Sequence, residues 1–283
     1  MRETATPLAA WSATAVVLAG ALWMLIDVLW RGAPGLSLEF LLETPRDAGR
    51  AGGVAPILLS TVWILVVALA AALPLGLATA IWLSESTLQR PRLQRAVRLS
   101  LDMLAGVPSI VFGLFGNAVF AVALGMGLSI LSGGLTLACM ALPIIIRTAE
   151  EGLRALPPEL RLQAAALGLR RSRIVLGLLL PAALPALLAG TLLGIGRALA
   201  ETAALIFTSG YVDRAPQSWL DSGRALSVHI YDLSMNVPGG ERNAYTSALV
   251  LMALILGINA ATHAAARQWR HALRWQDPAT IDR

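Results

Sequence analysis

The sequence predicts an all-α integral membrane protein with six transmembrane helices. Of its 283 residues, 57% are hydrophobic and only 14% are charged, and the mean hydropathy is +0.69. Soluble globular domains carry about 25% charged residues, so this composition lies well outside their range. Apolar runs recur along the chain, and about 20 apolar residues are enough for one helix to cross a bilayer.

Six apolar runs are visible, and each is expected to form one span. They occupy residues 8–30, 54–83, 97–123, 128–146, 174–207 and 245–266. The first run is longer than the apolar core of a signal peptide and no small-residue cleavage site follows it, so we expect an uncleaved helix. Prolines within the second to fifth runs predict kinks, because membrane helices tolerate proline where neighbouring groups satisfy the freed carbonyls.

The arginines orient the chain in the membrane. All 22 basic residues are arginine, and fourteen of them lie at the N-terminus, after the second and fourth runs, and in the C-terminal tail. Only six lie in the alternate loops. Because cationic loops stay in the cytoplasm, the sequence predicts a multi-pass protein of the cell inner membrane with both termini cytoplasmic. The same rule accounts for the pI of about 10.5, so the positive charge does not require a nucleic-acid partner. A nucleic-acid-binding surface would interleave basic and aromatic residues, and the sequence shows no such pattern.

This orientation divides the chain into three parts. Residues 1–53 are expected to form an N-terminal transmembrane helix and a periplasmic loop. Residues 54–266 are expected to form a core of five helices, and residues 267–283 a cytoplasmic tail. The single cysteine, Cys139, lies in an apolar run and has no second thiol to pair with, so it is expected to be a small packing residue.

The charged cytoplasmic loop 148–173 is expected to contain a short helix. Pro158 and Glu159 suit a first helical turn, because proline presets the backbone and an acid complements the helix dipole. Residues 159–167 are good helix formers, and Gly168 supplies a C-terminal stop. Two interpretations remain open: an interfacial helix that rests on lipid, or a docking element for a cytoplasmic partner.

The end of this loop resembles a known signature. The run LRLQAAALGLRRSRIVLGLLLP is similar to the cytoplasmic-loop signature of ABC import permeases, which reads Glu-Ala-Ala, three residues, Gly, nine residues, Ile-x-Leu-Pro. Gly168, Leu180 and Pro181 match the signature at its spacing. The resemblance implies that the loop fits a groove on an ATP-hydrolysing subunit and transmits its closure to the membrane helices.

The first positions of the signature depart from the family pattern. Leu162, Gln163 and Ala164 stand where the family has Glu-Ala-Ala, so the acidic residue is absent. The resemblance therefore implies a docking helix that relies on shape and apolar packing rather than on a contact of that carboxylate.

Further stretches resemble the phosphate-specific permeases, and among them the A-type subunits (PstA). They are LAGVPSIVFGLFG (104–116), LPIIIRTAEEGLRALPPELR (142–161), GIGRALAETAALIFTSG (194–210) and LSVHIYDLSMNVPGGERNAY (226–245). With the second apolar run, the resemblance covers roughly residues 52–266. It implies a type I ABC importer permease (MetI-like) core that imports inorganic phosphate. It also implies four further chains: a homologous C-type permease, two copies of an ABC ATPase and a periplasmic or extracellular phosphate-binding protein.

The residues assign ATP hydrolysis to another chain. A phosphate-binding P-loop requires a lysine, and this sequence has none. His229 has no second histidine or cysteine at ligand spacing, so no metal site is expected. We therefore expect a membrane subunit without catalytic residues or cofactor, and ATP to be used by the partner.

Three charged residues are candidates for the translocation pathway. A charge inside the bilayer is costly, so it usually faces a cavity or a partner. Arg197 and Glu201 are four residues apart in the fifth run, which places them on one face of a helix, and a guanidinium suits an oxyanion. Glu201 would position Arg197, or the two would form an ion pair that only locks helices. Arg147 closes the fourth run and would face the pathway, snorkel, or pair with Glu150 or Glu151.

Three rival functions remain. A permease for sulfate, molybdate or phosphonate would use the same arginines. An intramembrane enzyme would need a catalytic pair in facing spans, which the sequence lacks. A secondary transporter would work without an ATPase partner.

Overall fold

A computed structural model describes residues 5–85 and 91–274 of the chain, with side chains for all of these except 5–10, 265, 266 and 268–274. The chain divides into two compact units, which are taken separately below. The first unit contains residues up to Ala55 together with His229–Ala253. The second contains Pro56–Val228 and the chain from Leu254 onward. The last helix contributes to both units.

The first unit combines one long apolar helix with a small hairpin. Its elements are α1 (Ala5–Gly32), the 3₁₀ turn η1 (Ala33–Gly35), α2 (Leu38–Leu42), β1 (Pro45–Arg46), the turn η2 (Asp47–Gly49), β2 (Ala51–Gly52), most of α11 (Leu226–Met235) and the first half of α12 (Glu241–Arg274). β1 and β2 pair antiparallel. The Asn243 amide donates a 2.8 Å hydrogen bond to the Gly49 carbonyl, which fastens α12 to the hairpin.

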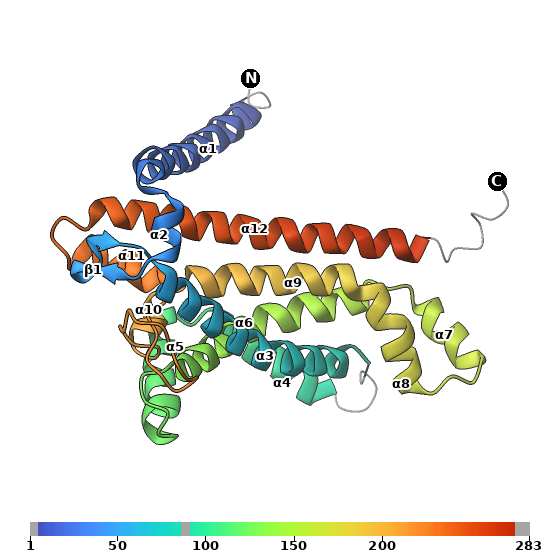
Figure 1. Cartoon of the computed structure of the whole chain (residues 1–283). Helices are drawn as coiled ribbons and strands as arrows, with labels where there is room; N and C mark the ends of the chain where they lie inside the picture. Colours follow the sequence, from blue (N-terminus) through green and yellow to red (C-terminus); the bar gives the residue numbers. More distant parts are fainter. Residues whose placement is uncertain (1–4, 86–90, 275–283) are drawn as a thin grey trace. The chain divides into compact units, whose positions relative to one another are not determined.

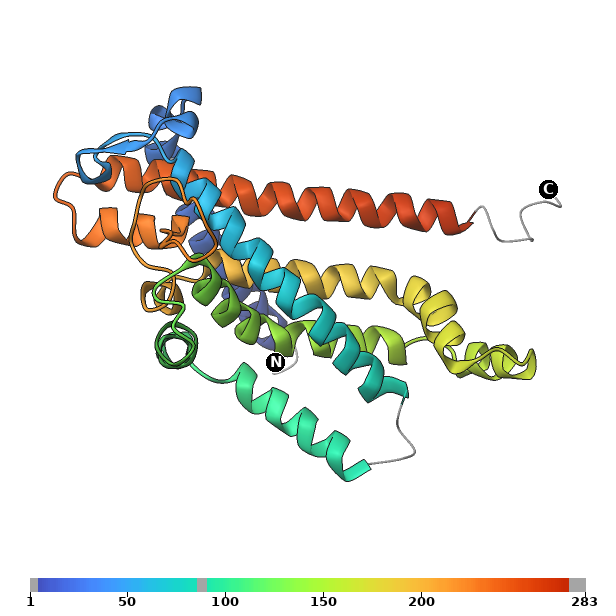
Figure 2. The same cartoon turned by 60° about the horizontal axis from the view of Figure 1, so that its bottom comes forward.

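The second unit is a helical bundle in which α6 is central. Its elements are α3 (Ala55–Glu85), α4 (Pro91–Ala105), α5 (Ser109–Gly116), the π-helical η3 (Asn117–Ala123), α6 (Ile130–Arg154), α7 (Pro158–Ala166), α8 (Arg171–Ile174), the π-helical η4 (Val175–Leu179), α9 (Leu180–Ala200), α10 (Ala203–Ile206) and the rest of α11 and α12. About two-thirds of the apolar window of α6 is buried (67%), against 33% for α3 and 22% for the α8–α9 span. The helices α3, α6 and α9 lie alongside one another (Figures 1 and 2).

Small residues allow these central helices to approach closely. A Cβ atom added at Gly134 of α6 would lie 2.5 Å from the Val67 side chain of α3. One added at Gly190 of α9 would lie 2.8 Å from Thr148 of α6. Any larger residue would push these helices apart, as expected where membrane helices pack through small side chains.

The predicted helical membrane fold is confirmed. Five helices of the described chain are long and apolar enough to span a bilayer, and they correspond to the first, second, fourth, fifth and sixth apolar runs. The α1 helix is mostly apolar, with one ion pair between Asp27 and Arg31 near its end, and large side chains such as Trp11, Trp23 and Trp30 are exposed on it. Such a surface requires lipid or another membrane protein around it.

The third run differs from the single helix that we predicted. It is split into α4 and α5–η3, two helices that meet at an angle of 103°. Pro108 begins the second helix with an extended backbone (φ −59°, ψ 142°). Proline disfavours a helical conformation of the residue before it and donates no backbone hydrogen bond, so the helix breaks at this point.

The fourth and fifth spans also end elsewhere than predicted. The α6 helix continues to Arg154, so the first seven residues of the predicted loop 148–173 belong to the helix. The α9 helix ends at Ala200, and Glu201 is extended (φ −79°, ψ 126°). The Ser227 hydroxyl donates a 2.6 Å hydrogen bond to the Glu201 carbonyl, a tertiary contact that replaces helical pairing there.

Candidate functional site

The short helix α7 forms where the sequence predicts it, from Pro158 to Ala166. Proline at the first position and Glu159 in the first turn suit the helix start. Gly168 follows the helix with a left-handed backbone (φ +73°). Its N–H donates to the Ala165 carbonyl (3.0 Å) and the Leu169 N–H donates to the Ala164 carbonyl (3.2 Å). This pair of bonds is the Schellman motif, in which glycine ends a helix without steric cost.

The signature positions lie on two faces of α7. Ala164 is buried (4% exposed) in a cluster with Leu153, Ile174, Leu179 and Ala183, which joins α7 to the ends of α6, α8, η4 and α9. Leu180 and Pro181 form the first turn of α9, directly after this cluster.

The exposed surface of α7 and of the turn after it carries large apolar side chains. Leu162 is 71% exposed and Leu167 is 79% exposed, and Gln163 is exposed beside them. The residue that replaces the family's acid thus projects away from the chain. Large exposed apolar side chains at the tip of a short helix are typical of an interaction site.

Arg161 fastens α7 to the membrane helices, a role that the sequence analysis did not identify. Its guanidinium donates hydrogen bonds to the Glu85 carboxylate at the end of α3, the shortest of them 2.8 Å. It also donates to the Leu153 carbonyl (2.8 Å) in the last turn of α6 and to the Leu156 carbonyl (3.4 Å) just after that helix. A planar guanidinium can serve several acceptors at once, so one side chain fixes α7 against two spans.

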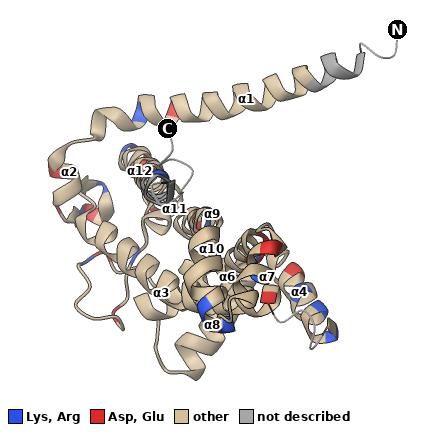
Figure 3. Cartoon of the chain, turned by 90° about the vertical axis from the view of Figure 1, so that its right-hand side faces the viewer, with Lys and Arg blue, Asp and Glu red and all other residues tan. Residues whose placement is uncertain are grey.

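A second cluster of charges lies nearby. Glu150 of α6 is buried (3% exposed) and accepts from Arg98 of α4 at 2.8 Å, and it pairs with Arg154 at 3.2 Å. Arg98 and Arg154 also donate to the Leu83 carbonyl near the end of α3. Charged residues are concentrated around α4, α7 and α8, whereas the ribbons of α3 and α6 are mostly uncharged (Figure 3). These contacts join α3, α4 and α6 at the end of the bundle that carries α7.

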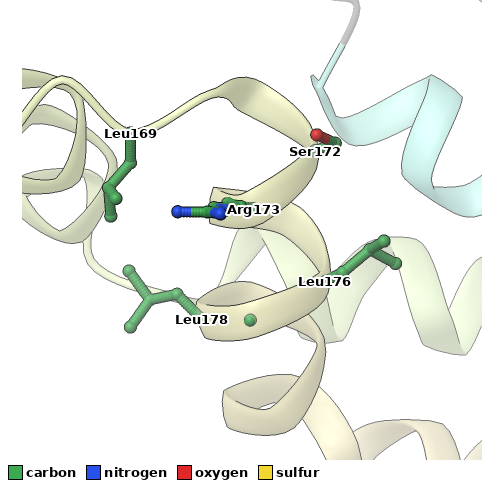
Figure 4. Close-up of a pocket in the computed structure, with 6 residues that line it drawn as sticks. Leu169, Ser172, Arg173, Leu176 and Leu178 are labelled. Atoms are coloured by element: carbon green, nitrogen blue, oxygen red, sulfur yellow. The ribbon is translucent and has the colours of Figure 1, made fainter.

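A cavity of about 540 Å³ lies beside the end of α7. It is lined by Leu169, Ser172, Arg173, Leu176, Gly177 and Leu178. The Arg173 side chain extends between Leu169 and Leu178 (Figure 4). Together with the exposed face of α7, this cavity gives the end of the bundle an apolar, cationic surface.

Arg147 pairs with a residue other than the two glutamates that we considered. Its guanidinium forms an ion pair with Asp102 of α4. Glu150, one of its predicted partners, is occupied by Arg98 and Arg154. The pairing with Glu150 is therefore wrong, because α4 packs against α6 and brings Asp102 to Arg147, which no local spacing could indicate.

The predicted pairing of Arg197 with Glu201 is also not formed. Glu201 lies beyond the end of α9, so the two residues do not share a helical face. The Glu201 carboxylate instead accepts from the Ala204 N–H at 3.5 Å and so lies at the start of α10. Arg197 is exposed and lines a cavity of about 510 Å³, and no described residue forms an ion pair or hydrogen bond with it.

The two candidate arginines are not brought together by the fold. Thr148, next to Arg147, lies opposite Gly190 of α9. Arg197 is seven residues further along α9, or about 10 Å at the helical rise. The structure thus places the predicted docking residues together near α7, and separates Arg147 and Arg197 along the bundle.

Two known permeases are similar in sequence to this chain. The chain is 35% identical over 213 residues to the phosphate transport system permease protein PstA 1 of Mycobacterium tuberculosis (strain CDC 1551 / Oshkosh), covering 75% of this chain and 69% of that protein. It is 28% identical over 249 residues to the probable ABC transporter permease protein YqgI of Bacillus subtilis (strain 168), covering 83% and 84%.

The fold has a counterpart among solved structures. It is similar to a chain of the MetNI methionine ABC transporter in an inward facing conformation, with a TM-score of 0.60, 18% identity, and coverage of 76% of this chain and 95% of that chain. This likeness confirms the predicted importer-permease fold. The family model described as "Binding-protein-dependent transport system inner membrane component" matches residues 72–267, and the chain belongs to that family.

Proposed function

We propose that this chain is one permease subunit of an ATP-driven importer of inorganic phosphate. It pairs with a homologous C-type permease, and the translocation pathway runs between the two. Two copies of an ABC ATPase bind on the cytoplasmic side and use ATP, and a phosphate-binding protein delivers the substrate from outside. The chain lies in the inner membrane with both termini cytoplasmic. The tail beyond Arg274 lies outside the described residues.

The observation that carries this proposal is the attachment of α7 to the ends of the membrane helices. Its buried face, with Ala164, joins the ends of several spans, while Leu162 and Leu167 project outward. Arg161 ties it to α3 and α6 through Glu85 and two carbonyls. A partner that moves α7 would therefore move those spans directly. An ATPase groove with apolar walls fits Leu162, which replaces the family's acid.

Phosphate as the substrate is supported by the PstA relative at 35% identity and by Arg197, with which no described residue forms an ion pair or hydrogen bond. Arg197 faces the pathway and attracts the oxyanion, since a guanidinium offers two parallel donors. Arg147 is neutralised by Asp102, so we assign it to joining α6 with α4 rather than to substrate contact. Glu201 does not position Arg197; its carboxylate accepts from the Ala204 N–H and so joins the end of α9 to α10.

The test begins with the tagged chain purified from its native membrane in mild detergent. We expect a second permease and an ATPase to accompany it. The purified complex is then placed in vesicles with the binding protein, and uptake of labelled phosphate and labelled sulfate is measured with and without ATP. Uptake of phosphate that requires ATP supports the proposal.

Other results reject it in distinct ways. Uptake of sulfate in preference to phosphate would identify a permease for another oxyanion. Uptake that continues without ATP and without an ATPase in the complex would identify a transporter driven by ion gradients.

A further inference from the structure

Two polar residues of α12 line the same cavity as Arg197. The cavity of about 510 Å³ that Arg197 lines is bounded by α9 and by the second half of α12, which belong to the same unit. Four of its lining residues are small or apolar: Ala189, Leu192, Leu193 and Gly196. The other three are Arg197, Asn259 and His263. Asn259 and His263 are four residues apart, so they lie on one face of α12.

All three polar side chains can donate hydrogen bonds. The guanidinium offers five N–H groups, the amide two, and the imidazole at least one. No described residue forms a hydrogen bond or ion pair with Arg197, Asn259 or His263. No carboxylate is among the residues that line the cavity. The lining is therefore an apolar wall with three donors and a net positive charge.

Donors without acceptors are unfavourable in free energy on a membrane helix unless a ligand or water accepts their hydrogen bonds. Both helices are long and apolar enough to span a bilayer. Polar groups without partners lose several kcal/mol when hydrocarbon surrounds them. Three of them on facing helices, in one cavity, indicate that the cavity receives something polar. Because the lining donates and is cationic, an anion with several acceptor oxygens fits it best.

We propose that Arg197, Asn259 and His263 form one binding site for a phosphate oxyanion. The inference deepens the proposed function and rests on it, since it adds two residues of α12 to the site that Arg197 begins. The phosphate group has two possible sources, the transported inorganic phosphate and the headgroup of an anionic phospholipid. An amide and an imidazole beside a single guanidinium hold the oxyanion with fewer arginines than a cluster of guanidinium groups would, which favours its release.

The test uses the complete transporter in vesicles of phosphatidylcholine, with and without phosphatidylglycerol. Three variants examine the site. Asn259→Asp is nearly isosteric and replaces two donors with a negative charge, His263→Leu removes a donor, and His263→Gln keeps one. Leu256→Ala, on an exposed part of the same helix, is the matched control. The initial rate of labelled phosphate uptake and the phosphatidylglycerol retained in native mass spectra are measured for each.

If the site holds transported phosphate, Asn259→Asp and His263→Leu lower the uptake rate by about tenfold in both kinds of vesicle, because each loses a hydrogen bond to a charged group. His263→Gln then restores part of the rate, and lipid retention is unchanged. If the site holds a headgroup, the rate falls only in vesicles with phosphatidylglycerol, and the variants lose the bound lipid.

The proposal is overturned if Asn259→Asp and His263→Leu match Leu256→Ala in both uptake and lipid retention. It is also overturned if His263→Gln is as defective as His263→Leu, since a packing role would not depend on a donor. Assembly with the ATPase is checked for every variant. A wild-type complex that transports sulfate but not phosphate contradicts the proposed function alone, and the same variants then test the site with sulfate.

Discussion

Single arginines have clearly different surroundings in this chain. Arg161 donates to four acceptor oxygens, Arg147 pairs with one carboxylate, and Arg197 has no partner among the described residues. The amino-acid type is the same in each case, so the neighbours decide the role. An arginine with its donors filled joins elements, and one with free donors on a cavity wall is available for an anion.

Arg161→Lys is expected to separate ATP hydrolysis from transport. Lysine keeps the charge, but a single ammonium cannot serve the Glu85 carboxylate and two carbonyls together. Loss of hydrogen bonds of this kind costs about 1–3 kcal/mol, which is enough to loosen α7. In vesicles, we expect phosphate transported per ATP hydrolysed to fall several-fold while the complex still assembles.

Arg92→Lys is the control for this prediction, because Arg92 lies exposed on α4 without a hydrogen bond or ion pair to a described residue. An unchanged ratio of transport to hydrolysis in Arg161→Lys would show that the contacts of Arg161 do not couple α7 to the spans.

Among the elements, α7 shows most clearly how local sequence and packing cooperate. Its start and stop come from Pro158 and Gly168, which are local signals. Its position comes from Ala164 in the shared cluster and from Arg161. The third span shows the reverse case, because its proline predicted a kink but its uniform apolar run did not indicate two helices that meet at 103°.

Gly168→Ala is expected to fray the end of α7. A side chain at φ +73° costs roughly 1–2 kcal/mol in the left-handed region, although space around this glycine is open. The Leu169 N–H, which bonds to the Ala164 carbonyl, should therefore exchange its hydrogen about tenfold faster.

Hydrogen exchange followed by mass spectrometry measures this rate. Gly257→Ala in α12 is the matched control, since its added Cβ also meets open space and its backbone is not left-handed. Equal exchange of Leu169 in Gly168→Ala and the wild type would show that the glycine is not needed to end the helix.

At the scale of the whole molecule, the distribution of arginine predicts the direction of the chain in the membrane. In the second unit, α7, α8 and the turn between them carry four of the arginines on which the predicted direction depends: Arg161, Arg170, Arg171 and Arg173. Arg2, Arg90 and Arg283 contribute to the count but lie outside the described residues.

The single cysteine allows a direct test of this orientation. With Cys139→Ala as the background, Gln163→Cys on α7 and Ser218→Cys in the loop before α11 are labelled in intact cells with a membrane-impermeant maleimide. Because both positions are exposed, access from outside decides the reaction. We expect Ser218→Cys to react and Gln163→Cys to react only after the membrane is opened. The reverse pattern would contradict cytoplasmic termini.

The sequence by itself determined which segments enter the membrane and where α7 begins and ends. Apolar length and helix-end signals act over a few neighbouring residues, so they can be read without the fold. The tertiary structure alone decided the angle at which the third span bends, the partner of Arg147, the separation of Glu201 from Arg197, and the meeting of Arg197 with Asn259 and His263. Each of these depends on residues distant in the chain, whose contacts are set by how the helices pack rather than by local spacing.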